Sequence, residues 1–266
     1  MVRIGNELAM GRLIPYLGPE TLLLGGPVSI PASSRALAEC LSAKHTVPAR
    51  ARGNAWASAQ FIETRRHRQT LAKLMAEIFS PPAPLNQLHG WLAGLALPLI
   101  VDAWYDECLA ASLTGNWGQI QAVTRNGKHE DIWYRALRPD GAAAAVGETD
   151  GWTTILYKPH GAVKPNNEFL LSDSDYVEVL TEIDIQTPIP PQVQTRRATS
   201  GFVFLGCRFR DQMERIFARQ IMKRSAGPYF AVLAGETTRN EQRFLDEMAI
   251  ERIDLPLGEA VSRMAC

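Results

Sequence analysis

One histidine stands where a strand is expected to end. The segment 153–161 begins with β-branched and apolar residues and closes on Pro159, His160 and Gly161. Proline stops ladder pairing and glycine permits a sharp exit, so His160 should lie at the carboxyl end of the strand. Ligands of open α/β sheets bind at that edge, and an imidazole can take a proton near neutral pH without a metal. His160 is therefore a candidate for acid–base chemistry; the alternative is a histidine that merely caps a loop.

A second candidate element is the turn after the first strand. The apolar segment 13–17 runs into Gly18, Pro19, Glu20 and Thr21. A strand followed by a glycine turn is how a nucleotide-binding unit opens. This turn has a single glycine, and strand–turn junctions are common in α/β proteins. As a phosphate-binding pattern it is weak.

Two more strand ends carry polar residues or glycine. The segment 97–101 is apolar on both faces, as a central parallel strand should be, and Asp102 and Asp106 follow it. The segment 201–205 is the cleanest buried strand, and Gly206 and Cys207 follow directly. Because the carboxyl ends of parallel strands share one edge, we expect Gly18, Asp106, His160 and Gly206 to converge there.

The elements that would position these residues alternate along the chain. Strand and helix alternation favours a Rossmann-like, doubly wound, mainly parallel α/β sheet. The expected strands are 13–17, 97–101, 154–158, 201–205 and 229–233, with a shorter one at 250–255. We interpret residues 1–266 as one domain, with a helical insertion at 31–95 and a small β and loop insertion at 114–150. Within the latter, 119–125 and 132–137 alternate like antiparallel strands.

The helical insertion contains one long helical stretch, 56–79, with apolar residues at helical spacing. Its basic cluster, Arg65 to Arg68, is interpreted as a solvated helix face rather than a nucleic-acid patch. Further helices are expected at 85–95, 106–113, 210–224, 237–248 and 257–264.

Composition narrows the classes of function. Among 266 residues, 28 Lys and Arg balance 28 Asp and Glu, so no overall field attracts nucleic acid or an anionic membrane. No window approaches the apolar length of a membrane span, and the first residues are too polar for a signal peptide. The four cysteines are scattered singly, which indicates neither a zinc site nor a disulfide framework. We expect a cytoplasmic protein without a metal.

The order of these features resembles the sirtuin-like superfamily. Lys158-Pro159-His160-Gly161 matches the Lys-x-His-Gly of that family, and 99–106 falls where the family has Thr-Thr-Asn-Tyr-Asp. The segment 204–209 lies where it has a Phe-Leu-Gly-Tyr-Ser-like strand end. The layout is closer to the bacterial sirtuin-like domains of NAD-hydrolysing antiphage systems than to sirtuin protein deacylases. Without paired zinc ligands, protein deacylation is not expected.

The resemblance implies NAD as the cofactor, His160 as general base on a ribose hydroxyl or water, and Asp106 as its retained catalytic companion. It also implies a set of cofactor-binding positions: Gly18, Glu20, Thr21, Trp104, Gly161, Gly206 and Cys207. Two of these depart from the family pattern. Glu20 replaces a glycine of the Gly-Ala-Gly-x-Ser turn, and it would bring bulk and negative charge beside phosphate. Trp104 replaces the asparagine that positions the nicotinamide ribose, and an indole cannot accept a hydrogen bond.

Three functions follow from this pattern. The first is a nucleotide-binding protein for NAD or ADP-ribose type molecules with weak or lost NAD cleavage. The second is an active NAD hydrolase of the defence type that uses His160 as general base. The third is a non-catalytic scaffold that binds a protein partner or a second copy of itself. Trp104 separates them, because its ring is expected to occupy space that the reacting ribose would need.

Overall fold

The computed structural model describes residues 1–123, 133–176 and 189–265. Eight strands form one sheet in the order β10-β9-β8-β1-β2-β5-β3-β4, parallel except for β4, which pairs antiparallel with β3. The strands are β1 (Leu13–Leu17), β2 (Leu99–Asp102), β3 (Trp117–Ala122), β4 (Tyr134–Leu137), β5 (Thr154–Lys158), β8 (Gly201–Leu205), β9 (Tyr229–Val232) and β10 (Ile250–Ile253). The Rossmann-like α/β prediction is confirmed, including the bounds of β1, β5 and β8.

Helices cover both faces of the sheet because the central strands are apolar on both sides. In β8, Phe202 and Phe204 face one helix layer, whereas Val203 and Leu205 face the other. The first layer contains α8 (Pro191–Arg197), α9 (Gln212–Met222) and α10 (Arg239–Glu247). The second contains α1 (Val2–Ala9), α5 (Gln87–Gly94), α6 (Cys108–Ser112) and α11 (Leu257–Met264).

The order of the strands places a switch point beside β1. The chain passes from β1 to β2 on one side, and it later returns to lay β8 against the other side of β1. The loops that follow β1 and β8 therefore diverge at neighbouring strand ends. In open α/β sheets ligands bind at such a point.

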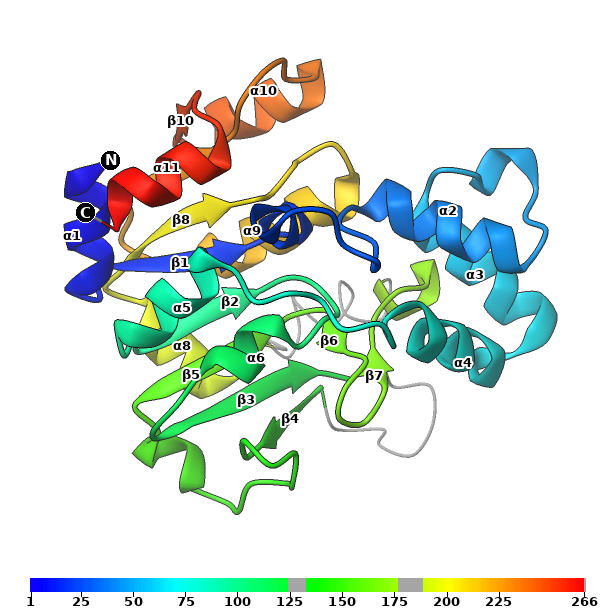
Figure 1. Cartoon of the computed structure of the whole chain (residues 1–266), viewed down its shortest axis with the longest axis horizontal. Coiled ribbons are helices and arrows are strands. Elements are labelled where there is room, and N and C mark those ends of the chain that lie inside the picture. Colours follow the sequence, from blue (N-terminus) through cyan, green and yellow to red (C-terminus); the bar gives the residue numbers. More distant parts are fainter. Residues whose placement is uncertain (124–132, 177–188, 266) are drawn as a thin grey trace.

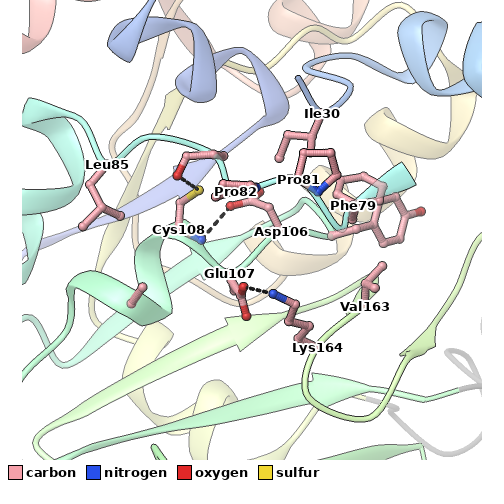
Figure 2. Close-up of a pocket in the computed structure, with 13 residues that line it drawn as sticks. Ile30, Phe79, Pro81, Pro82, Leu85, Asp106, Glu107, Cys108, Val163 and Lys164 are labelled. Carbon is pink, nitrogen blue, oxygen red and sulfur yellow. Dashed lines mark hydrogen bonds and ion pairs between the residues drawn. The ribbon is translucent and has the colours of Figure 1, made fainter. Parts of the chain in front are cut away.

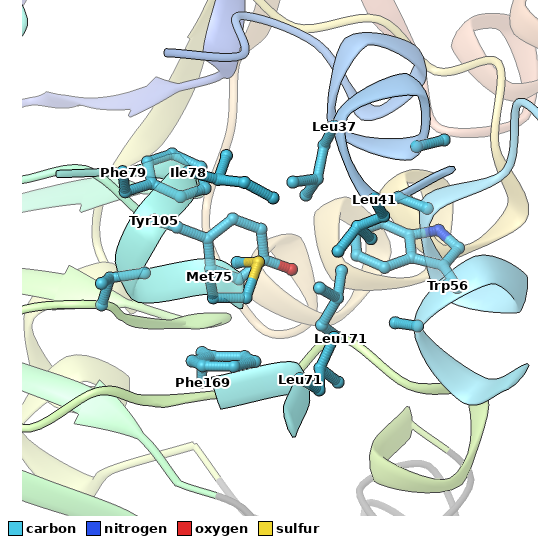
Figure 3. Packing of buried hydrophobic residues seen from close by; sticks show 14 of the residues in the cluster. Leu37, Leu41, Trp56, Leu71, Met75, Ile78, Phe79, Tyr105, Phe169 and Leu171 are labelled. Atoms are coloured by element: carbon cyan, nitrogen blue, oxygen red, sulfur yellow. The ribbon is translucent and has the colours of Figure 1, made fainter. Parts of the chain in front are cut away.

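A helical module lies beyond the carboxyl edge of the sheet. It contains α2 (Ser34–Lys44), α3 (Ala55–Arg66) and α4 (Arg68–Ile78), and the strand arrowheads point toward it (Figure 1). The module packs against residues that follow the sheet strands (Figure 3). The contacting side chains are Leu37 and Leu41 of α2, Leu71 and Met75 of α4, and Tyr105, Phe169 and Leu171. The module thus closes the edge where the candidate residues were expected.

The helical stretch 56–79 was predicted as one helix, and this is wrong. α3 and α4 meet at His67, which has φ 71° and ψ 155°. A non-glycine residue at positive φ ends the first helix and redirects the second. The break lets Ile62 of α3 and Leu71 of α4 enter the same core.

The basic cluster at this break is only partly a solvated face. The Arg68 guanidinium lies 2.7 Å from Asp175 and 3.2 Å from Glu63, and 4.6 Å from the centroid of the Phe169 ring. Arg68 therefore links the start of α4 to the segment that follows β7 (Glu168–Phe169), because it pairs with Asp175 in a largely buried position. For this residue the prediction of a solvated face is wrong.

Several smaller elements went unpredicted or differ. The N-terminal helix α1 packs on α11, and the turn after β1 continues as the 3₁₀ helix η1 (Pro19–Gly25). A two-stranded sheet pairs β6 (Gly161–Ala162) with β7 (Glu168–Phe169). Short 3₁₀ turns η2 (Ala49–Ala51) and η3 (Glu148–Gly151) complete the described elements. Positions 124, 125 and 132 of the expected antiparallel strands lie outside the described residues, and the domain boundaries stay predictions.

Candidate functional site

The turns after β1 and β8 lie against each other at the switch point. A Cβ atom added to Gly18 would collide with Gly206 O and would lie 2.8 Å from Cys207 Sγ. Gly206 has φ 66°, and a Cβ there would lie 2.5 Å from Thr21 N. Glycine is thus needed at both positions for close approach of two backbones. These glycines hold the two turns together and leave no gap between them.

The amide groups of the first turn are already used. Gly18 N–H donates to Leu205 O at 2.9 Å, and Glu20 N–H donates to Gly206 O at 3.1 Å. Thr21 donates twice to Gly18 O, from its amide at 3.2 Å and from its hydroxyl at 2.7 Å. Pro19 has no N–H to offer. A phosphate-binding turn needs free, converging N–H groups, whereas the N–H groups of this turn already donate to protein carbonyls.

The Glu20 carboxylate is partly buried near basic side chains. Burial raises the pKa of Glu20, while the guanidinium groups of Arg208 and Arg210 oppose the rise. Glu20 therefore lies near a basic pair in the loop after β8. That loop also carries the ion pair between Arg208 Nε and Glu241 Oε1, which is 2.9 Å long.

His160 is enclosed by aromatic rings at the end of β5. Its exposed fraction is 4%, and its ring lies 4.4 Å from Phe217 and 6.1 Å from Trp56, centroid to centroid. Removal from water lowers the pKa of His160 to about 3, and the nearby Lys158 ammonium contributes to the same decrease. His160 is therefore neutral at physiological pH.

The hydrogen-bond network anchors Nδ1 of His160. The Tyr176 hydroxyl lies 2.9 Å from His160 Nδ1 and 3.0 Å from Leu170 O, which also accepts from the Tyr105 hydroxyl at 2.8 Å. When Tyr176 donates to Leu170 O, Nδ1 carries the imidazole proton and Nε2 is unprotonated. Nε2 has no hydrogen-bond partner among the described residues. Tyr176, which the sequence did not identify as a site residue, thus orients a nitrogen that can accept a proton.

His160 lines a small cavity of about 30 Å³, the His160 cavity. Its walls come from the two turns, the end of β2 and the helical module, and include Gly18, Ser34, Trp56, Trp104, Cys207 and Glu214. About one or two water molecules would fill it. Binding sites for small molecules are about 300–1,000 Å³, so NAD does not fit this cavity.

Trp104 forms one wall of the His160 cavity, as its position after β2 predicts. The indole is 3% exposed, and its N–H donates to Pro31 O at 2.8 Å. The ring also packs 5.1 Å from Tyr105 and 6.2 Å from Phe79. These contacts anchor Trp104, which makes it a fixed part of the wall.

Glu214 of α9 supplies a carboxyl group to the same cavity. Its Oε1 accepts from the Ser34 hydroxyl at 3.0 Å, and its Oε2 accepts from Asp211 N–H at 3.2 Å. Burial and the neighbouring Asp211 carboxylate raise the pKa of Glu214 to about 8. The capping box from Asp211 to Glu214 is visible in the sequence, but the Ser34 partner comes from the distant α2. Glu214 is a site residue that sequence reasoning missed.

Asp106 lies in a different place from His160. It lines a mainly apolar pocket of about 230 Å³ with Phe79, Pro81 and Cys108, the Asp106 pocket (Figure 2). Its carboxylate accepts from Cys108 N–H at 2.8 Å and so caps α6. The expected pair of His160 and Asp106 is therefore divided between two cavities, because the adjacent side chains of Trp104 and Tyr105 stand between them.

A buried ion pair connects the ends of β2 and β5. Lys158 Nζ lies 2.7 Å from Asp102 Oδ2 and 2.7 Å from Asp106 O. Burial raises the pKa of Asp102 to about 6, and Lys158 opposes this rise. The lysine of the Lys-x-His-Gly pattern thus holds the two strand ends together and takes no part in lining the His160 cavity.

The remaining predicted positions have structural roles. Gly161 has φ 70° and begins β6, where a Cβ would lie 2.7 Å from Ala122 O. Cys207 is buried, and loss of hydration raises the pKa of its thiol. Four predicted residues line the His160 cavity: Gly18, Trp104, His160 and Cys207. Thr21 and Gly206 lie where the two turns contact each other. Gly161 directly follows His160 in the chain.

Comparison with family sequence models identifies a match. The sequence model of the SIR2-like domain family matches residues 98–253, which include β2, His160 and the β8 end. No curated protein matches the chain. Within the described residues, no group of three or more His, Cys, Asp and Glu side chains could hold a metal ion. No helix in this part of the chain is long and apolar enough to cross a membrane.

Proposed function

Because this chain belongs to the SIR2-like domain family, we propose that it is a member of that family in which NAD cleavage is weak or lost. One observation carries the proposal: the turn that should cradle a diphosphate donates its N–H groups to Leu205, Gly206 and Gly18. Nucleotides of the NAD or ADP-ribose type would have to separate the two turns before they could bind. Binding would therefore be weak, since those hydrogen bonds must first be broken.

The size of the His160 cavity supports the same proposal. A volume of about 30 Å³ leaves no room for a ribose beside His160 and Trp104. Trp104 is held by its hydrogen bond to Pro31 O, so clearing the space costs that bond and the ring contacts. A role in antiphage defence stays a prediction.

A second candidate, an active NAD hydrolase, is favoured by a separate observation. His160 Nε2 is without a partner among the described residues and can accept a proton in the tautomer that is protonated on Nδ1, and the carboxyl of Glu214 lies on the cavity wall. Together they form a base and an acid in one small space, as general acid–base catalysis requires. If the turns open, both groups are already in place.

The deciding experiment measures ligand binding and turnover on the full chain. We expect the unaltered protein to show little thermal shift with NAD or ADP-ribose and little release of nicotinamide. Replacing Trp104 by Asn and Glu20 by Gly together should open the cavity and restore a shift with ADP-ribose, measured against the melting temperature of the variant itself. The two single variants separate the contribution of the wall from that of the turn.

A specific result would overturn the proposal in favour of the second candidate. Robust nicotinamide release by the unaltered protein, abolished in His160→Ala while the circular dichroism spectrum stays native, would identify an active hydrolase. Turnover need not return in the double variant, because the two substitutions widen the cavity and loosen the turn without adding any catalytic group.

A further inference from the structure

A groove between α9 and α10 gathers three arginine side chains. It has a volume of about 390 Å³, and its charged lining residues are Arg215, Arg219, Arg243 and Glu247. Gln212 and Asn240 add side-chain amides, and Phe244 lies among the lining residues. Three cations face one anion, so the lining carries an excess of two positive charges. We call this feature the arginine groove.

Contacts within the protein hold the three guanidinium groups in place. Arg215 Nη1 donates to Phe209 O and Arg210 O, both at 2.6 Å. Glu247 pairs with Arg219 at 3.0 Å and with Arg243 at 3.5 Å. Arg219 also lies 6.0 Å from the centroid of the Phe244 ring. Because these contacts already restrict the arginine side chains, less side-chain entropy is lost when a ligand binds them.

Most donors of these groups stay available. A guanidinium has five N–H groups, and the described residues use two from Arg215 at most and one or two each from Arg219 and Arg243. Burial raises the pKa of Asp211, and the nearby Arg215 charge opposes this rise. Asp211 does not line the groove. The free donors thus outnumber the acceptors that face them.

We propose that the arginine groove binds a small molecule that carries a diphosphate group. Arginine forks match the paired oxygens of phosphate, and each pairing makes charge-assisted hydrogen bonds. Arg215 and Arg219 lie one helical turn apart on α9 and Arg243 lies on α10, so the three guanidinium groups are distributed over a groove of about 390 Å³. A diphosphate offers two linked sets of oxygens and can contact more of these groups at once than a single phosphate can. This site is separate from the His160 cavity, and the inference does not depend on the proposed function.

The test titrates inorganic pyrophosphate into the full chain by calorimetry at low salt. We expect saturable binding of one pyrophosphate per chain, tighter than that of inorganic phosphate. Arg215→Gln, Arg219→Gln and Arg243→Gln should each weaken binding about five- to tenfold, the loss of one charge-assisted contact. Raising the salt concentration should weaken binding in the unaltered protein, since the groove is open to solvent.

Arg263→Gln is the matched control. Arg263 of α11 is 56% exposed and pairs with Glu259, just as Arg219 is 56% exposed and pairs with Glu247. Its replacement removes the same net charge and should change pyrophosphate affinity less than twofold. Absence of saturable binding, equal affinity for phosphate and pyrophosphate, or an equal loss in Arg263→Gln would each overturn the proposal.

Discussion

The loop after β8 leads to two regions with opposite properties. The His160 cavity, which Cys207 and Arg208 of this loop help to line, is small and has mostly uncharged walls. The arginine groove lies between α9 and α10, and it is larger and lined by four charged residues. The family match includes His160 and the residues of the arginine groove but not the turn after β1, whose N–H groups donate to the protein itself. A histidine at a strand end can thus lie beside a cavity that lacks the space and the free donors that nucleotide binding needs.

The largest expected effect tests what keeps the cavity closed. Gly206→Ala should lower the free energy of unfolding by about 3 kcal/mol or more, because its Cβ would meet Thr21 at a positive φ. Gly235→Ala is the matched control: φ is 76°, and no heavy atom lies within 4 Å of the added Cβ. The control should lose about 1–2 kcal/mol. Equal losses in urea unfolding would show that the turns are not in tight contact.

A smaller effect is expected from the partner of His160. Tyr176→Phe leaves Nδ1 without its hydrogen-bond partner and should lower the free energy of unfolding by about 1–2 kcal/mol. Nitrogen chemical shifts of the imidazole, measured by NMR, should change because the balance of the two tautomers is no longer set by Tyr176. Tyr229→Phe, whose hydroxyl lies 2.9 Å from Ser225 Oγ in a more exposed place, serves as control. An unchanged His160 spectrum would show that Tyr176 does not hold Nδ1.

The smallest effect concerns pH. The folded pKa of Glu214 is about 8 against 4.5 when free, so the folded state holds this proton more tightly and stability falls as pH rises toward 8. His160, with a pKa of about 3 against 6.5, has the opposite sign and loses stability as pH falls from 6.5. Between pH 6.5 and 8 the His160 contribution is nearly constant and Glu214 remains.

Glu214→Gln should therefore flatten the decline in unfolding free energy between pH 6.5 and 8. The expected change is about 1 kcal/mol, allowing for the partial exposure of this carboxyl. Glu39→Gln, on the solvent side of α2, should leave the slope as it is in the unaltered protein. A slope that persists in Glu214→Gln would mean that this carboxyl is already ionised at the cavity.

The sheet could be predicted from sequence because its strands carry a local pattern. Residues 201–205 are apolar on both faces and bounded by glycine, and that pattern fixed β8 to the residue. The break at His67 could not be predicted, since a positive φ at histidine leaves no pattern in the chain. The closure of the cavity was equally invisible. It depends on Gly18 and Gly206 meeting in space, and each glycine alone looks like an ordinary turn.

In the candidate site, too, residues with a local sequence pattern could be predicted and residues that depend on distant contacts could not. Trp104 was identified by its place after β2, and a large apolar ring there predicts a wall. Glu214 was missed because Asp211 and Glu214 look like a helix cap, which they also are. Its second role comes from Ser34, and a contact across that separation in sequence cannot be seen before the chain is folded.

The position of β1 between β2 and β8 bears on how the protein is made. The main chain of Tyr16 contacts the thiol of Cys207, 191 positions later, so β1 cannot complete its pairing until β8 has been synthesised. Such non-local pairing is slow to form, and until β8 leaves the ribosome β1 has one unpaired edge. Nascent chains cut short before residue 201 should present that apolar edge to one another. A chaperone that shields growing chains would then matter more for this protein than for one built from local hairpins.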